Sequence, residues 1–377
     1  AFDDPSTYQR PDSFTGAFVF TSDGRSLLAG VVPGAGAARA ANGSSGDVQV
    51  WDLDGKPRER LPGQFLTLVP AAGGFVLAGR ASRPTNPRAE VELVVVEAAS
   101  GQERARFGRR PGIQPDPGRA TLDPAAIAPL AVSPDGRLLA EVRPGPGGLG
   151  AILLWDSVTG QELHRFPTKG FGVHDLAFAP DGRTLASAGE DGCVLLWDIA
   201  TVRARPARSA PRPEELPGLW DALAASDAGA AYRAMVKLAA APAPAVELFR
   251  GRLRPVERVD TDRLQRLAAA LDDSRFAARQ EATAALTAAA EQAVPVLRRL
   301  LDGRPSLEQR QRAEQLLAKI GPPVADPDQL RALRAIEVLG WVGSPAARQV
   351  LEGLTKGAPA ARLTRAAADS LAPLGFR

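Results

Sequence analysis

The first half of the chain repeats one pattern four times, in which short apolar runs are separated by turns containing Asp-Gly or Gly-Gly. The clearest unit consists of residues 173–182, 183–192 and 193–199. Its apolar runs alternate or stay continuously apolar, as β-strands do. Glycine in the turns reaches positive φ without steric cost, which favours hairpins. The pattern therefore predicts antiparallel strands connected by tight turns.

The other three units keep this order in weaker form. Each has an apolar run with a turn and a later strand that ends at a Trp-Asp position: 18–24 with Trp51-Asp52, 66–74 with Val96-Glu97, and 130–136 with Trp155-Asp156. The Trp positions are 42 (155 to 197) to 59 (96 to 155) residues apart, and a further glycine turn and strand follow each of these three. We therefore expect four strands in each of them.

Four strands per unit and a terminal Trp-Asp dipeptide resemble the blade of a WD40 β-propeller. The resemblance covers roughly residues 14–202, and Thr168-Lys169 stands where the family usually has Gly-His. It implies about four blades, as an open arc or as the end of a larger ring, and we expect the chain to be the C-terminal part of a longer protein. It also implies structural roles in the blades for Trp51, Asp52, Asp135, Gly136, Trp155, Asp156, Asp181, Gly182, Asp191, Trp197 and Asp198.

The second half carries helix start and stop signals in series, and we expect nine or ten short helices. The start signals are Ser226-Asp227, Asp273-Ser274, the capping box from Ser306 to Gln309, Asp326-Pro327 and Ser344-Pro345. Helices should stop at Gly321, Gly343 and Gly357. The helix expected at 275–290 places Phe276, Ala282 and Leu286 on one face.

Residues 271–283, followed by 293–301, resemble a HEAT-type helical repeat, whose stacked helix pairs share a continuous core. The whole tail is also similar to that of bacterial WD40 proteins, in which propeller and tail often follow a signalling or transcription module; its matching segments are 219–224, 231–234, 330–339 and 356–364. We expect a multidomain β + α chain with WD40-type propeller blades at 1–202, a Pro/Arg-rich linker at 203–213 and an all-α HEAT-like helical repeat domain at 214–377.

The composition offers little material for catalysis. One cysteine, Cys193, and two histidines, His164 and His174, are too few for an internal disulfide or a Cys/His metal site. Cys193 stands beside Val194 at the start of a strand, so we expect a small core residue. Residues 145–150 match G-x-G-x-x-G, but a strand pattern follows instead of the helix that would bind a pyrophosphate. We predict no enzymatic activity, no metal and no cofactor.

The 46 Lys+Arg and 43 Asp+Glu leave a net charge of +3, which alone does not argue for nucleic acid or membrane. The linker arginines are little neutralised and are candidates for an electrostatic contact: Arg203, Arg205, Arg208 and Arg212. A second basic cluster near one helix junction consists of Arg298, Arg299, Arg304, Arg310 and Arg312. Acidic residues are interleaved with it, which favours a solvated, ion-paired face.

Both repeat-built halves offer surfaces suited to docking other proteins. The favoured hypothesis is a non-catalytic protein–protein interaction scaffold, as the docking or regulatory part of a larger signalling or transcription protein. The alternative is nucleic-acid binding or transcription regulation through the linker and the helix junction. No stretch approaches the ~20 apolar residues of a membrane helix, so we expect no membrane contact and a cytoplasmic location.

Overall fold

The computed structural model describes the strands within residues 18–97 and then residues 99–110, 129–133, 136–143, 150–157, 160–168, 172–203, 210–320, 324 and 326–371. Side chains are described at residues 95, 97 and 99–106 and, apart from Arg203, in the ranges from 129 onward.

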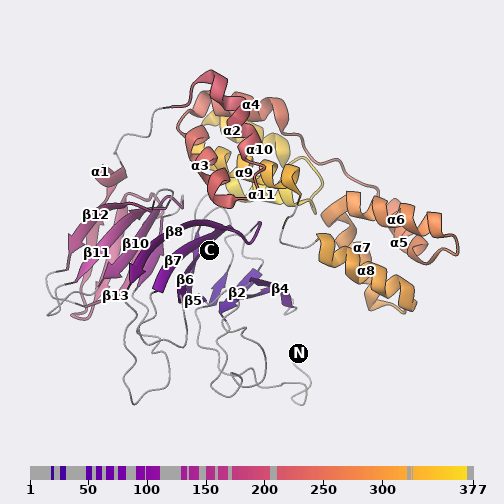
Figure 1. Ribbon diagram of the computed structural model, residues 1–377, viewed down its shortest axis with the longest axis horizontal. Coiled ribbons are helices and arrows are strands. Elements are labelled where there is room, and N and C mark those ends of the chain that lie inside the picture. Colours follow the sequence, from indigo (N-terminus) through magenta and orange to yellow (C-terminus); the bar gives the residue numbers. More distant parts are fainter. Residues whose placement is uncertain are drawn as a thin grey trace, which may run out of the picture. The chain divides into compact units, whose positions relative to one another are not determined.

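The chain divides into two compact units (Figure 1). The first, the strand unit, is formed mainly by residues up to 207 and contains all the described strands and the short helix α1 (Ala200–Arg203). The second, the helical unit, is formed by residues 208–226 and 230–373.

The strand unit contains four antiparallel sheets, in each of which the strand order follows the chain. The first three have four strands and the fourth has three. In chain order the strands are β1 (Phe18–Phe20), β2 (Ser26–Gly30), β3 (Val48–Asp52) and β4 (Pro57–Leu61); β5 (Phe65–Ala71), β6 (Phe75–Ala81), β7 (Val91–Glu97) and β8 (Glu103–Arg110); β9 (Leu130–Val132), β10 (Leu138–Arg143), β11 (Ala151–Asp156) and β12 (Glu162–Pro167); β13 (Val173–Phe178), β14 (Thr184–Gly189) and β15 (Val194–Asp198). The predicted antiparallel strands are confirmed.

The Trp-Asp dipeptides hold the same register position in their sheets. In the third sheet Trp155 lies opposite Leu139, and in the fourth Trp197 lies opposite Leu185. Trp51 of the first sheet pairs in the same way with the second residue of β2. The repeat in the sequence therefore corresponds to the same strand pairing in these three sheets.

Glycine closes the hairpins between the first two strands of the third and fourth sheets. Gly136 has φ 70° and Gly182 has φ 60°, in the left-handed region that other residues avoid. The N–H of Gly136 donates to Ser133 O and that of Gly182 donates to Ala179 O, both at 2.8 Å. The two hairpins are built alike, as the shared Asp-Gly turns predict.

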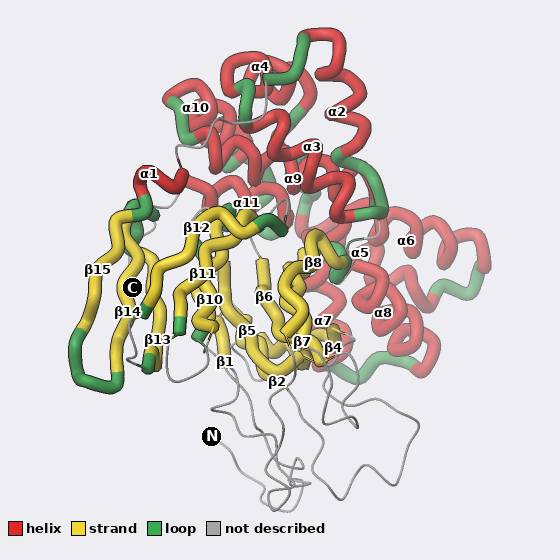
Figure 2. The backbone as a smooth tube through the Cα atoms, turned by 60° about the vertical axis from the view of Figure 1, so that its left-hand side comes forward, coloured by secondary structure: helices red, strands yellow, loops and turns green. Residues whose placement is uncertain are grey.

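Successive sheets contact one another through their first strands. β5 lies against β1 (Figure 2). β5 and β13 also each lie against β9. The third and fourth sheets share one apolar core, to which Ile152 and Leu154 contribute from one side and Leu176, Leu185 and Ile199 from the other. These five side chains are at most 5% exposed.

The helical unit contains ten described α-helices, in line with the expected nine or ten. They are α2 (Leu216–Ala222), α3 (Ala228–Ala239), α4 (Pro242–Arg252), α5 (Thr261–Ala269), α6 (Phe276–Ala289), α7 (Val294–Asp302), α8 (Leu307–Ile320), α9 (Pro327–Val342), α10 (Pro345–Leu354) and α11 (Arg362–Leu371). Helices α5–α8 share a core that includes Leu264, Leu286, Leu297 and Leu316. Helix α9 packs against α4, α10 and α11.

Several predicted helix boundaries are confirmed. The side chains of Asp326 and Ser344 each accept a hydrogen bond from an N–H in the first turn of α9 and α10. Ser306 and Gln309 form the expected capping box, with backbone-to-side-chain bonds of 3.3 and 3.1 Å. Gly343 ends α9 with φ 58°.

Two helix starts differ from the predictions. α8 begins at Leu307, three residues before the expected start at residue 310, because its capping box already lies within the first turn. α6 begins at Phe276 instead of residue 275, because Asp273 accepts from the N–H of Arg275 at 2.8 Å and holds a turn before the helix.

Candidate functional site

The tryptophans expected to have structural roles end the third strands of their sheets. Trp197 is half-buried, its indole Nε1 donates to Ser187 Oγ at 2.9 Å, and its ring lies 4.9 Å from that of Phe166 on β12. Trp155 is buried on β11. Trp51-Asp52 ends β3, where the structure describes the backbone alone. Trp197 therefore contacts both its own sheet and the preceding one.

The aspartates singled out from the sequence serve local turns wherever their hydrogen bonds are described. Asp181, Asp191 and Asp198 each accept, through Oδ1, a bond from the N–H two residues later, at 2.8, 3.0 and 2.9 Å. Asp156 is half-buried, and its N–H donates to Gln161 O at 2.9 Å. Asp135 lies outside the described residues. Each of the first three carboxylates thus stabilises its own turn.

Of the linker arginines, Arg212 alone has a described side chain. Arg203 ends α1, and Arg205 and Arg208 lie outside the described residues. Arg212 is exposed and pairs with Glu214 at 3.2 Å and with Glu215 at 3.6 Å. A backbone hydrogen bond from Arg212, with its charge nearby, lowers the pKa of the Glu215 carboxyl. This cation is therefore largely neutralised.

The prediction that Cys193 is a core residue is wrong, because its thiol is exposed. Cys193 precedes β15, the last described strand of the fourth sheet, and the adjacent Val194 is 64% exposed. The apolar run therefore marks a strand at the edge of its sheet rather than one in the core. A hydrogen bond to the Asp191 carboxylate, together with its charge, raises the pKa of the Cys193 thiol.

One face of the fourth sheet is apolar and uncovered. Val194 and Leu196 on β15 are 64% and 71% exposed. Cross-strand pairing places Ala188 and Ala186 of β14 beside them, and Ala177 of β13 beside Ala186. We call these five residues the open sheet face.

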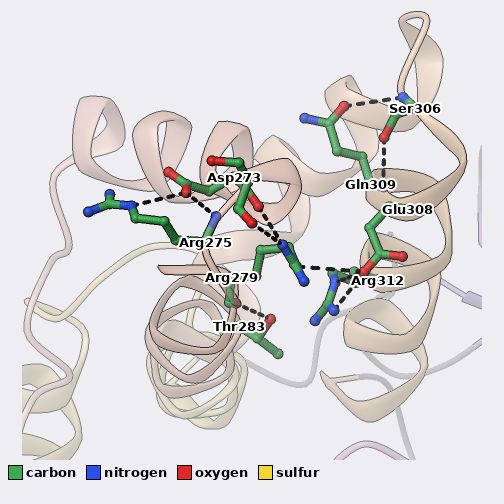
Figure 3. Close-up of polar contacts among 9 residues, drawn as sticks. Asp273, Arg275, Arg279, Thr283, Ser306, Glu308, Gln309 and Arg312 are labelled. Carbon is green, nitrogen blue, oxygen red and sulfur yellow. Dashed lines mark hydrogen bonds and ion pairs between the residues drawn. The ribbon is translucent and has the colours of Figure 1, made fainter. Parts of the chain in front are cut away.

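A charged network joins the N-terminal ends of α6 and α8 (Figure 3). Glu308 Oε1 accepts from Arg312 Nε at 2.6 Å and lies 3.9 Å from Arg279 Nε. Arg279 Nη1 also donates to Asp273 O at 2.6 Å, and Arg275 pairs with the Asp273 carboxylate at 3.3 Å. The backbone and side-chain bonds from Arg275 lower the pKa of Asp273.

Two large apolar side chains are exposed on the two helices that carry this network, α6 and α8. Phe276 is 64% exposed and Leu307 is 72% exposed. The Arg279 guanidinium lies over the Phe276 ring, 5.7 Å from its centroid, and pairs with Glu308, the residue after Leu307. We call the set of Asp273, Arg275, Phe276, Arg279, Leu307, Glu308 and Arg312 the helix junction.

The prediction that Phe276 shares a face with Ala282 and Leu286 is wrong. Ala282 and Leu286 are 1% and 0% exposed, whereas Phe276 points to solvent. Six residues of α-helix rotate a side chain by about 600°, which places Phe276 about 120° away from Ala282.

The other arginines of the predicted basic cluster do not join the network in the described contacts. Arg298 is half-buried, and three are exposed: Arg299, Arg304 and Arg310. Arg312 is the member of that cluster that pairs with Glu308. The expected ion pairing is thus observed at this position.

The buried charged residues that escaped the sequence analysis include an ion pair in the second sheet and an arginine on α9. Glu97 and Arg104 of the second sheet form an ion pair at 2.7 Å, with both side chains 2% exposed, and Ser100 Oγ also donates to Glu97. Arg334 on α9 is 1% exposed. Its position four residues after Leu330 and four before Val338 puts an arginine in the middle of a buried apolar face, which is the signal that could have identified it.

The glycine-rich match at 145–150 leads into a strand. Residues 145–149 lie outside the described part, and β11 begins at Ala151 directly after Gly150. Among the residues that the structure describes, no group of three or more His, Cys, Asp or Glu side chains is placed to hold a metal ion. None of the helices in the described ranges has the length and apolar character needed to cross a bilayer.

Comparison with known protein families identifies one repeat in the chain. Residues 160–198 match the family described as WD domain, G-beta repeat, so the chain contains a WD40 repeat. The matched segment begins two residues before β12 and runs to the end of β15.

Curated relatives match parts of the chain. Over 150 residues, 34% of this chain, it is 31% identical to Centriole proteome protein 16 of Chlamydomonas reinhardtii, 7% of which is covered. Over 73 residues, 19% of this chain, it is 36% identical to Small ribosomal subunit protein RACK1z of Arabidopsis thaliana and to RACK1 of Brassica napus, 20% of each being covered. The chain thus spans a fifth or less of the length of these relatives.

Similar solved structures include TolB from Acinetobacter baumannii and the computationally designed Ika4 protein. TolB is 16% identical with a TM-score of 0.34, and the match covers 47% of this chain and 40% of TolB. Ika4 is 19% identical with a TM-score of 0.32, and the match covers 50% of this chain and 94% of Ika4.

Proposed function

We propose that this WD40-repeat chain is a non-catalytic scaffold that binds another protein through the helix junction. The observation that carries the proposal is the exposure of Phe276 and Leu307, at 64% and 72%, beside one charged network. Large apolar side chains grouped at a surface and bordered by polar groups are typical of protein interfaces. The aromatic ring under Arg279 has the character of an interface anchor.

The charges at the helix junction support a protein partner over a phosphate backbone. Phosphate binding needs cations that are not already neutralised. Arg279 and Arg312 share Glu308, and Arg275 pairs with Asp273. Nucleic-acid binding through the linker and the junction is therefore the less favoured alternative.

We further propose that the four sheets act as WD40-type propeller blades and that α2–α11 form a HEAT-like repeat domain. Domain limits of 1–202 and 214–377, joined by a linker at 203–213, are supported by the change from the strand unit to the helical unit at residue 208. The predicted blade positions remain part of this proposal, as does a bacterial origin. So does the role of docking part in a larger signalling or transcription protein.

The proposal is tested with the full chain. Immobilised chain captures proteins from a nuclease-treated extract of the source cells, and a captured protein is then purified and titrated by calorimetry. Because Phe276 is the proposed anchor, Phe276→Ser should weaken binding about tenfold or more. Ala284→Ser, at an exposed position on the same helix, is the matched control and should leave the affinity unchanged.

Two results would contradict the proposal. One is equal affinity of the wild type and the Phe276→Ser variant, which would place the contact elsewhere. The other is capture from an untreated extract that is absent from the nuclease-treated one, which would make nucleic acid the bound partner.

A further inference from the structure

The third sheet shows what covers a face like the open sheet face. Its residues at the same register positions are Ala131, Ala140, Val142, Ile152 and Leu154. All five are buried, with exposed fractions of 5%, 0%, 7%, 0% and 0%. They belong to the apolar core that the third sheet shares with the fourth.

The open sheet face is therefore the repeat-equivalent of a buried contact between sheets, and no further sheet follows it among the described residues. Its alanines and aliphatic residues match the third sheet position by position, yet Val194 and Leu196 are 64% and 71% exposed. The described residues of the strand unit leave this face uncovered, and a further sheet at this position would bury it.

The residues that cover the third sheet define what a covering sheet must carry. On the fourth sheet, the covering positions include Leu176, Phe178, Leu185 and Trp197. The backbone register of the first sheet puts apolar residues at all four equivalent positions, namely Phe18, Phe20, Leu27 and Trp51. A first sheet therefore has the residue types to cover an open sheet face.

We propose that a second copy of this chain covers the open sheet face with its first sheet. Two chains related by a twofold axis then make this contact twice, and their eight sheets, four from each chain, close into one ring. Eight lies within the range of about four to eight blades found in propellers. The helix junction takes no part in this contact, so the inference is independent of the proposed partner site.

The test is the mass of the full chain in solution, measured by sedimentation equilibrium over a range of concentrations. The wild type should have twice the 39.5 kDa mass of one chain. Leu196→Glu should reduce the mass to that of one chain, because it puts a charge into the contact. Leu307→Glu, equally exposed but in the helical unit, is the matched control and should keep the doubled mass.

Circular dichroism shows whether each variant folds. If Leu196→Glu does not fold, Val194→Lys tests the same face with a second charged substitution. Three outcomes would overturn the inference: a wild type with the mass of one chain at every concentration, a wild type that assembles beyond two chains, or a doubled mass that both face variants retain. If the Leu307→Glu variant loses partner binding but keeps the doubled mass, the contact between the two chains is distinct from the proposed partner site.

Discussion

Arg334 in α9 donates a hydrogen bond from Nη1 to the carbonyl of Leu223 at 2.6 Å, across 111 residues of sequence. The same nitrogen lies 2.8 Å from Ala225 O. Leu223 is the C-cap of α2, and carbonyls at a helix C-terminus have no partner inside the helix. The buried guanidinium supplies the missing donor and places positive charge at the negative end of the helix dipole. This contact fixes the end of α2 against α9.

Arg334→Met should therefore destabilise the helical unit by about 3 kcal/mol, because hydrogen bonds from a charged donor are lost and buried carbonyls stay unpaired. Urea unfolding followed by circular dichroism measures the change. Arg348→Met, at an exposed position on α10, is the control and should change the stability by less than about 0.5 kcal/mol. Equal small effects of both variants would contradict the assigned role.

Trp197→Ala should destabilise the strand unit by about 3 kcal/mol, the low end for a large aromatic residue, because the ring is only half-buried against Phe166. Ser187→Ala should cost about 1 kcal/mol through the lost bond to the indole N–H. Thermal unfolding of the full chain compares both variants. A loss below about 1 kcal/mol for Trp197→Ala would mean that the ring does not bridge two sheets.

Gly182→Val should destabilise by about 1–2 kcal/mol, because φ is 60° and a side chain at Cβ is strained there. Gly182→Asn should cost less, since asparagine tolerates the left-handed region. Gly353→Ala in α10 is the control and should instead stabilise the chain. Alanine is favoured over glycine within a helix, and the added Cβ would meet open space. Should Gly182→Val prove as stable as the wild type, the turn does not require glycine.

The thiol of Cys193 should be slow to react with alkylating reagents at pH 8, because its pKa is raised by the Asp191 carboxylate. Asp191→Asn removes the charge, so the pKa should fall and the alkylation rate at pH 8 should rise. The chain has one cysteine, so the pH profile of labelling reports this thiol alone. An unchanged profile in the variant would show that Asp191 does not control the thiol.

Local signals in the sequence predicted much of the fold. Gly136 and Gly182 marked hairpins, Ser344 and Asp326 marked helix starts, and the Trp-Asp dipeptides marked equivalent strands. Each of these depends on residues a few positions apart, because turns and caps are made by neighbours in the chain. Such signals can be read from the sequence alone.

Exposure and long-range contacts could not be predicted in this way. An apolar run reveals a strand but not whether another sheet covers it, which is why Cys193 was misplaced. Arg334 depends on Leu223, and no local pattern connects two residues so far apart. The helix junction forms only when α6 and α8 meet, so its exposed Phe276 looked like a core residue in the periodicity of one helix.

The most direct test of the scaffold account is the salt dependence of affinity between the full chain and its captured partner. Calorimetry at 50 mM and at 200 mM salt should give affinities that differ by less than about tenfold, because packed apolar contacts release few counterions. A fall of about a thousandfold or more over the same range is the behaviour of a complex held by many phosphate contacts, and it would contradict a protein-binding surface at the helix junction.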